Sequence, residues 1–153
     1  MSRRNRFEAT TRITSPLENV FEFFSDPANL GRITPPSMRF RIIEAPARRL
    51  QEGDRIDYSI RVFGLPMRWR TRIVMWREGE AFADLQERGP YRLWIHTHTF
   101  HRDGEGVLMR DVVEYELPLG WVGRLFGGRL VARQIEGIFS YRAEAIERVF
   151  GAA

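Results

Sequence analysis

Residues 94–100 read Trp-Ile-His-Thr-His-Thr-Phe, and their alternation predicts a β-strand with two unlike faces. The even positions carry Trp94, His96, His98 and Phe100, while the odd positions carry an isoleucine and two threonines. Because side chains alternate across a strand, both imidazoles and both other rings share one face. A buried imidazole needs polar partners. This face therefore suits the wall of a cavity better than a dry core.

Similar alternation on both sides of this stretch predicts seven strands in all. They are Arg6–Ile13, Met38–Glu44, Asp54–Phe63, Met67–Arg77, Ala81–Gln86, Trp94–Phe100 and Val107–Leu117. Short turns join the last six strands, which favours an antiparallel meander. Asp26-Pro27 interrupts the segment between the first two strands and divides it into two short helices.

A long amphipathic helix is predicted over Arg129–Phe150, because apolar residues recur there at spacings of three and four. The face toward the sheet holds Val131, Ile135, Ile138, Phe139, Ile146 and Val149. The opposite face, with Arg133, Glu136, Arg142, Glu144, Glu147 and Arg148, is expected to be solvated. Ahead of this helix, Gly120–Gly128 carries Trp121, Leu125 and Phe126, and is either a mobile lid or a plain connection.

Length and composition favour one domain spanning residues 1–153, since a chain with 43% hydrophobic residues can bury a substantial core. The absence of cysteine excludes disulfides, thiolate metal sites and cysteine nucleophiles. No apolar run approaches the roughly 18 residues of a membrane span, so no stable membrane insertion is expected. No apolar run follows the charged N-terminus as in a secretory signal, so we expect a cytoplasmic location.

The basic residues are all arginine, which gives an isoelectric point of about 10.3 at a net charge of only +4. Acidic and basic residues are interspersed, so no nucleic-acid partner is expected. Arg68, Arg70 and Arg72 alternate on one outward strand face, which favours a solvated surface. Val74 and Trp76 continue that row, so a protein contact or a homodimer surface is a further hypothesis.

The order of one strand, two helices, six strands and a long helix is that of the helix-grip fold. Residues with characteristic spacing accompany it, including Phe7, Ile13-Thr14-Ser15-Pro16, Val20-Phe21, Phe23, Asn29-Leu30, Pro35-Pro36, Phe82, Asp84, Gln86, Gly89-Pro90, Trp94, His96, His98, Phe100, Asp111, Tyr115 and Leu117-Pro118. On these residues the chain resembles the SRPBCC superfamily, which includes START-like, Bet v 1-like and polyketide cyclase/dehydrase-like proteins, and within it a bacterial subgroup.

The resemblance implies an α+β fold in which a curved seven-stranded antiparallel sheet wraps around the long C-terminal helix. Two short helices would lie between the first and second strands, and an apolar cavity between the sheet and the C-terminal helix. It implies no single activity, because members include lipid carriers, hormone receptors and cyclases.

The candidate ligand-binding residues follow from alternation on the expected inward faces. The apolar set is Tyr58, Trp69, Met75, Phe82, Trp94, Phe100, Met109, Tyr115, Ile135, Ile138 and Phe139. The polar set is Asp84, Gln86, His96, His98 and Asp111. Asp111 is expected opposite His96 or His98, and the sequence does not resolve which of the two.

Three interpretations of this polar set stay open. It is a structural hydrogen-bond network, a ligand-recognition site, or a chemical site in which Asp111 orients His96 or His98 as a proton shuttle. A metal held by His96, His98 and Asp111 is a fourth use of the same residues. Because two histidines at i and i+2 are weakly specific for metal, we assign neither a metal nor a cofactor.

The leading functional hypothesis is binding, for transport or sequestration, of a hydrophobic small molecule that is lipid-like or aromatic and polyketide-like. The first alternative is a cyclase or dehydratase acting on a polyketide-like substrate through a His–Asp pair, with His96, His98 and Asp111 as catalytic residues. The second alternative is a protein-interaction module. The sequence leaves open whether the protein is an enzyme.

Overall fold

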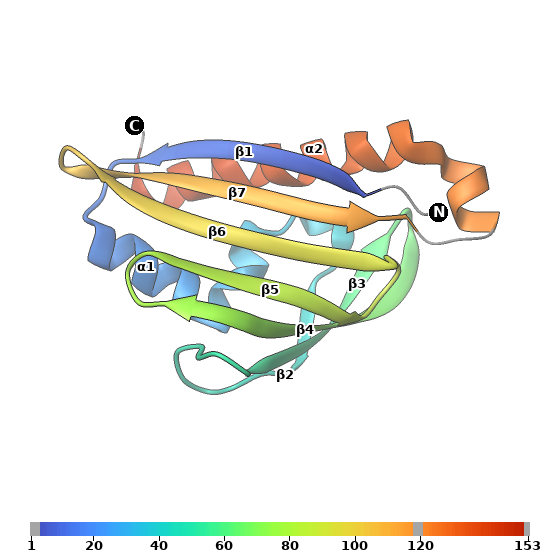
Figure 1. Cartoon of the computed structure of the whole chain (residues 1–153), viewed down its shortest axis with the longest axis horizontal. Helices are drawn as coiled ribbons and strands as arrows, with labels where there is room; N and C mark the ends of the chain where they lie inside the picture. The colour runs from blue at the N-terminus through green and yellow to red at the C-terminus, as the bar shows by residue number, and fades with distance from the viewer. Residues whose placement is uncertain (1–3, 118–120, 152–153) are drawn as a thin grey trace.

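The computed structural model describes residues 4–117 and 121–151, with the backbone alone described for residues 121–126. Within these residues, seven strands form one sheet in the order β1-β7-β6-β5-β4-β3-β2, and every neighbouring pair is antiparallel (Figure 1). The strands are β1 Asn5–Ile13, β2 Arg41–Glu44, β3 Arg55–Val62, β4 Leu65–Arg77, β5 Ala81–Arg88, β6 Leu93–Asp103 and β7 Gly106–Glu116. The predicted antiparallel meander is confirmed.

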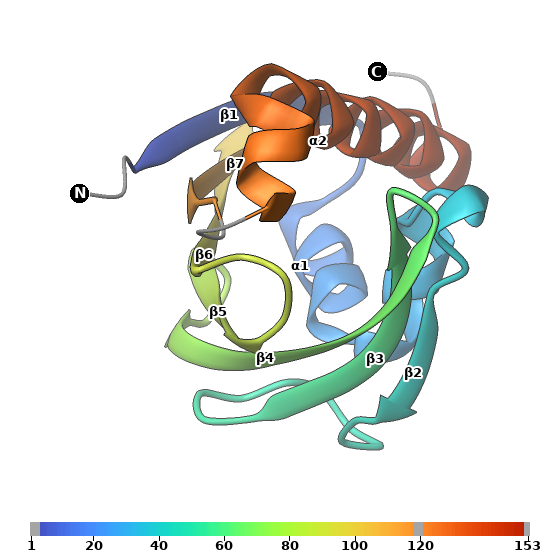
Figure 2. The same ribbon diagram turned by 90° about the vertical axis from the view of Figure 1, so that its right-hand side faces the viewer.

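Two helices and a short 3-10 turn connect β1 to β2, and one long helix follows β7. They are α1 Leu17–Ser25, the 3-10 helix η1 Pro27–Ile33, the 3-10 turn η2 Pro36–Met38, and α2 Trp121–Phe150. The Asp26 carboxylate accepts a hydrogen bond from the Ala28 backbone N–H at 2.9 Å, which caps η1. Figure 2 shows the sheet curled around the interior, with α2 across its open side. The predicted helix-grip architecture is confirmed.

α2 begins at Trp121, eight residues ahead of the predicted start at Arg129. Gly127 interrupts it with φ 63° and ψ 164°, a conformation that glycine adopts and other residues avoid. Residues 121–128 of the glycine-rich segment are therefore helical backbone around a break. The two alternatives for Gly120–Gly128, a mobile lid or a plain connection, stay open, because most of its side chains lie outside the described residues.

A β-bulge in β4 changes which side chains face inward. The register against β5 shifts by one residue between Ile73 and Met75, so alternation inverts beyond that point. Trp76 consequently packs inward, with ring centroids 5.4 Å from Phe21 and 5.1 Å from Phe82. The prediction that Met75 faces inward and Trp76 outward was wrong, because sequence alternation alone does not show an inserted residue.

The buried residues form two main clusters along α2. One joins α1 to the C-terminal part of α2 and includes Phe100 and Met109. The other joins β3, β4 and β7 to the earlier part of α2 and includes Tyr115 and Ile135. No helix of the described segments is long and apolar enough to cross a membrane.

Candidate functional site

A cavity of about 150 Å³ lies between the inner face of the sheet and α2. Several predicted residues line it: Tyr58, Trp69, Phe82, Asp84, Trp94, His96, His98, Ile138 and Phe139. Further lining residues that the sequence reasoning missed are Phe24, Leu30, Thr34, Met38, Phe40, Leu50, Ile56, Ile60, Val62, Thr71, Ile73, Tyr91, Gln134 and Arg142. Most of this wall is apolar, and much of it is aromatic.

The remaining predicted residues do not line the cavity, for identifiable reasons. The bulge in β4 removes Met75 from the inner face. Phe100, Met109, Tyr115 and Ile135 are buried within the two packed clusters and are not among the residues that line the cavity. Asp111 and Gln86 act from behind the lining residues, as described below.

Gln86 holds the loop between β5 and β6. Its Nε2 donates to the Tyr91 carbonyl at 2.7 Å, and its Oε1 accepts from the Tyr91 N–H at 3.2 Å. A Cβ at Gly89 would lie 2.5 Å from Gln86 Oε1, so the loop packs closely on this amide. The contact brings the Tyr91 ring to the cavity wall. Alternation ends at Gly89-Pro90, so the sequence did not indicate where Tyr91 points.

The polar set converges at one part of the cavity wall. Asp111 pairs with His98 in the β6–β7 register, but its Oδ1 contacts both imidazoles. It lies 2.7 Å from His96 Nε2 and 3.2 Å from His98 Nδ1. His98 Nε2 lies 3.1 Å from Asp84 Oδ2, and Thr71 Oγ1 donates to Asp84 Oδ1 at 3.1 Å. The structure thus brings four of the five predicted polar residues into one hydrogen-bonded cluster.

Arg142 of α2 completes this cluster, although it was expected on the solvated face of the helix. It is only 9% exposed, with its NH2 nitrogen 3.7 Å from Asp111 Oδ1 and 3.4 Å from His98 Nδ1. Its guanidinium carbon lies 5.3 Å from the Phe24 ring centroid and 5.6 Å from that of Phe139. Position 142 follows Ile138 by four and Phe139 by three, so helical spacing places it on the inward stripe. Arg142 was predicted to be solvated because it is charged, and this prediction was wrong.

The pKa values of the two histidines are shifted in opposite directions. Burial, reinforced by the charge of His98, lowers the pKa of His96 to about 4, so it is neutral at neutral pH. Burial also acts to lower the pKa of His98, but hydrogen bonds to Asp111 and Asp84 outweigh it, and this pKa is raised. A neutral His96 donates from Nε2 to Asp111.

Both carboxyl groups of the cluster stay ionised. Burial acts to raise the pKa of Asp111, but the Arg142 charge and both histidine hydrogen bonds hold it well below its usual range. Burial acts on Asp84 in the same direction, and the His98 hydrogen bond leaves its pKa lowered. Two carboxylates therefore lie beside the Arg142 guanidinium and His98, and a buried charge is tolerated when an opposite charge compensates it.

Three buried polar atoms of the cavity wall have no hydrogen-bond partner among the described residues. They are Trp69 Nε1, Gln134 Oε1 and Arg142 Nε. Buried polar atoms without partners are rare in proteins and cost free energy. Two of these atoms are N–H donors and the third is an amide oxygen, which accepts hydrogen bonds.

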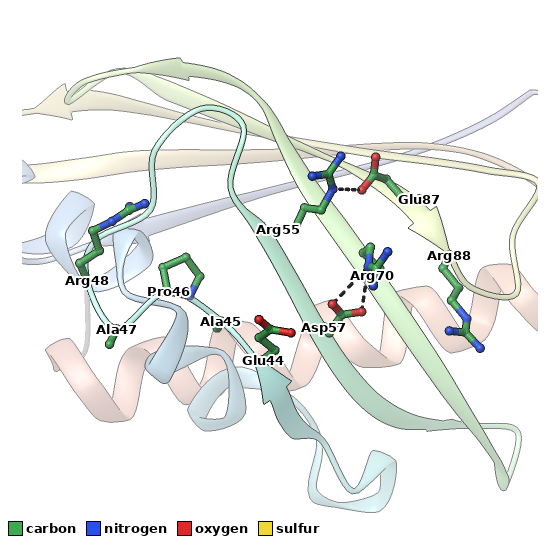
Figure 3. A pocket seen from close by; sticks show the side chains of 10 residues that line it. All are labelled: Glu44, Ala45, Pro46, Ala47, Arg48, Arg55, Asp57, Arg70, Glu87 and Arg88. Atoms are coloured by element: carbon green, nitrogen blue, oxygen red, sulfur yellow. Dashed lines mark hydrogen bonds and ion pairs between the residues drawn. The ribbon is translucent and has the colours of Figure 1, made fainter.

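A larger hollow of about 730 Å³ lies on the outer side of the sheet, among Arg48, Arg55, Arg70, Arg88 and neighbouring residues (Figure 3). Arg55 pairs with Glu87 at 2.6 Å, and Arg70 pairs with Asp57 at 3.0 Å. The arginines of both pairs are exposed, and ion pairs with exposed arginines are typical of a solvated surface. We therefore take the smaller inner cavity, which holds the buried polar cluster, as the candidate site.

Comparison with known families decides the relationship. The family described as polyketide cyclase / dehydrase and lipid transport matches residues 4–151. The chain belongs to this family. No curated protein matches the chain.

Solved structures agree with the polyketide cyclase / dehydrase and lipid transport assignment at the level of fold. A START superfamily protein from Mycobacterium smegmatis has a TM-score of 0.74 at 12% identity, covering 95% of this chain and 96% of that one. Major latex-like protein 151 of Panax ginseng has a TM-score of 0.71 at 16% identity, with coverages of 96% and 97%. A point mutant of norcoclaurine synthase from Thalictrum flavum, in complex with a transition state analogue, has a TM-score of 0.69 at 12% identity, with coverages of 98% and 96%. Family and fold together fit a protein that binds a hydrophobic ligand.

Proposed function

We propose that the protein binds a small hydrophobic, ring-containing molecule in the cavity between the sheet and α2. The observation that carries this proposal is the wall itself, in which Trp69 Nε1, Gln134 Oε1 and Arg142 Nε are buried without partners in largely apolar surroundings. A few convergent polar groups in an apolar pocket are the usual pattern of a small-molecule site. Such groups orient a ligand that carries oxygen atoms.

Cavity size and wall chemistry favour a ring over a long acyl chain. Cavities of roughly 150 Å³ accommodate a molecule of about the size of benzene. Trp69 stands with Tyr91 and Trp94 at ring-centroid distances of 5.8 and 5.4 Å, so one wall consists of aromatic surface. Aromatic ligands pack well in edge-to-face or offset geometry against such a wall.

Acetophenone, which has one ring and one carbonyl oxygen, is a suitable first probe, with binding measured by isothermal titration calorimetry. Ile138→Trp should abolish saturable binding, because Ile138 lines the cavity and the indole would fill it. Leu130→Trp is the matched control, since Leu130 is exposed on the same helix. Failure of ethylbenzene, acetophenone and benzoate alike to bind the wild type would contradict the proposal, as would unchanged binding to Ile138→Trp.

Acid–base catalysis is a second candidate, favoured by the 2.7 Å contact between His96 Nε2 and Asp111 Oδ1. Asp111 would orient a neutral His96 whose other ring nitrogen accepts a proton. This candidate ranks second because a histidine with a pKa of about 4 is a weak base at neutral pH. Its test is deuterium exchange at the acetophenone methyl group, which should be catalysed by the wild type and lost in His96→Gln. Exchange no faster than in buffer would eliminate it.

A protein-interaction module has less support than it had from the sequence. Trp76, the largest apolar residue of the expected contact row, packs inward against Phe21 and Phe82. Arg70 and Arg72 of the same row form ion pairs with Asp57 and Glu87.

A further inference from the structure

We propose that Asp84, His96 and His98 form a binding site for a divalent transition-metal ion, oriented from behind by Asp111. The inference goes beyond the proposed function, because it concerns the polar cluster whether or not an organic ligand fills the cavity. It also differs from the metal hypothesis drawn from the sequence, in which Asp111 was the third ligand.

The three side chains come from adjacent strands and converge on one point. Asp84 of β5 and His96 of β6 are directly paired in register, and His98 follows two residues later on the same face. One ligand atom of each lies within 4.8 Å of the others. His98 Nε2 and Asp84 Oδ2 are 3.1 Å apart. Two ligands each about 2.1 Å from one ion, at a roughly tetrahedral angle, lie about 3.4 Å apart. The His98–Asp84 pair is thus spaced close to two ligands of one ion, which would replace this hydrogen bond.

Groups around the three ligands hold them as metal sites require. A histidine that binds a metal usually gives its other ring nitrogen to a carboxylate, which fixes the orientation of the ring. Asp111 Oδ1 contacts His96 Nε2 and His98 Nδ1, which leaves His96 Nδ1 and His98 Nε2 to serve as ligand atoms. Thr71 Oγ1 donates to Asp84 Oδ1 and leaves Oδ2 for the ion. One carboxylate thus orients both imidazoles, and one hydroxyl orients the third ligand.

The donor set indicates the class of metal. Two imidazole nitrogens and one carboxylate oxygen suit Zn²⁺, Fe²⁺ or Co²⁺, whereas Mg²⁺ and Ca²⁺ prefer oxygen ligands throughout. Three protein ligands leave at least one coordination position open. Asp84, His96 and His98 all line the cavity, so that position would face its interior. Asp84 would supply one negative charge as a ligand and Asp111 a second from behind, and the Arg142 guanidinium near Asp111 offsets part of this charge.

Cobalt binding tests this site directly. Protein dialysed against EDTA and then against chelator-free buffer is titrated with Co²⁺, with visible absorption and calorimetry as readouts. We expect one equivalent to bind with the intense visible bands of a low-coordinate Co²⁺–imidazole site. Asp84→Asn, His96→Gln and His98→Gln should each weaken binding by roughly 100-fold or more, and Asp111→Asn by roughly 10- to 100-fold. Circular dichroism and thermal melts of each variant establish that it is folded.

His101→Gln is the matched control, because His101 lies on the same strand but is exposed. It should bind Co²⁺ as the wild type does. The proposal is overturned if the wild type gives no visible band, or if His101→Gln loses binding as the cluster variants do. It is also overturned if Asp84→Asn binds normally while Asp111→Asn does not, since the ligands would then be a different set. None of these outcomes bears on acetophenone binding, so the two proposals fail independently.

Discussion

Arg142 is the residue on which the buried charges of the site depend. Its guanidinium lies between the Phe24 and Phe139 rings and near Asp111, which is 2% exposed. A buried charge is tolerated when an opposite charge compensates it, and removal of one partner leaves the other uncompensated. Cation–π contacts with desolvated rings add to the stabilisation.

Arg142→Met should therefore lower the free energy of unfolding by about 2–4 kcal/mol, because it leaves the Asp111 carboxylate without its guanidinium. Arg133→Met is the control, since Arg133 is exposed on the same helix and its loss should change stability by no more than about 0.5 kcal/mol. Urea unfolding followed by circular dichroism measures both. Equal stability of the two variants would show that Arg142 carries no structural charge pairing.

The lowered pKa of His96 predicts that the stability of the metal-free protein depends on pH. Its pKa is about 4 in the folded chain against an ordinary value of 6.5, so folding favours the neutral form. Its stabilising contribution is complete above pH 6.5 and is lost as the pH falls toward 4, by about 3 kcal/mol in all. The raised pKa of His98 has the opposite effect on stability. Its stabilising contribution is complete below pH 6.5 and is lost as the pH rises. Urea unfolding between pH 6.5 and 4.5 should show a shallower decline in His96→Gln than in the wild type.

Two irregular elements determine what reaches the cavity. The bulge in β4 turns Trp76 inward and Met75 away from the inner face. The break at Gly127 divides α2, and the segment beyond it supplies Gln134, Ile138 and Arg142 to the site. Each irregularity involves a single residue. The first changes which side chains of β4 face inward, and the second divides α2 into two parts.

Because of the bulge, we expect substitutions at the neighbouring residues Trp76 and Met75 to reduce stability by different amounts. Trp76→Ala should destabilise the protein by about 3 kcal/mol or more, because it removes an indole packed on Phe21 and Phe82. Met75→Ala should cost about 1 kcal/mol or less, since Met75 is only partly buried and outside the core clusters. Thermal and urea denaturation give the comparison. The reverse order would mean that β4 has no bulge in solution.

Two glycines of α2 should respond in opposite directions to alanine. Gly127→Ala should destabilise by about 1–2 kcal/mol, because φ 63° with ψ 164° strains any residue with a Cβ. Gly137→Ala should stabilise by about 0.5–1 kcal/mol, since Gly137 is exposed in a regular part of the helix and a Cβ there meets nothing within 4 Å. Thermal melts of both variants settle the point. Stabilisation by both would place an unbroken helix through Gly127.

At the scale of the whole molecule, the fold could be predicted because its main signals are periodic. Alternation identified all seven strands, although the second begins at Arg41 and not at the predicted Met38, which belongs to η2. Spacing identified the later part of α2. The cavity position of His96, His98 and Asp84 followed from the same alternation. What escaped prediction was local or chemical: an inserted residue before Met75, a loop conformation at Tyr91, and an arginine that is buried because partners on other strands compensate its charge.

The strand order has a consequence for biosynthesis. Within the described sheet β1 is an edge strand that pairs with β7, and Asn5 lies opposite Tyr115, so the first strand of the sheet to be translated hydrogen-bonds to the last. At 5–20 residues per second, β1 must wait roughly 5–20 s on the ribosome before its partner is made. During that interval the apolar side chains of β1 lack their partner strand, so nascent-chain chaperones can bind β1. Completion of β7 then closes a loop of roughly 100 residues, which makes β1–β7 docking a natural late step in folding.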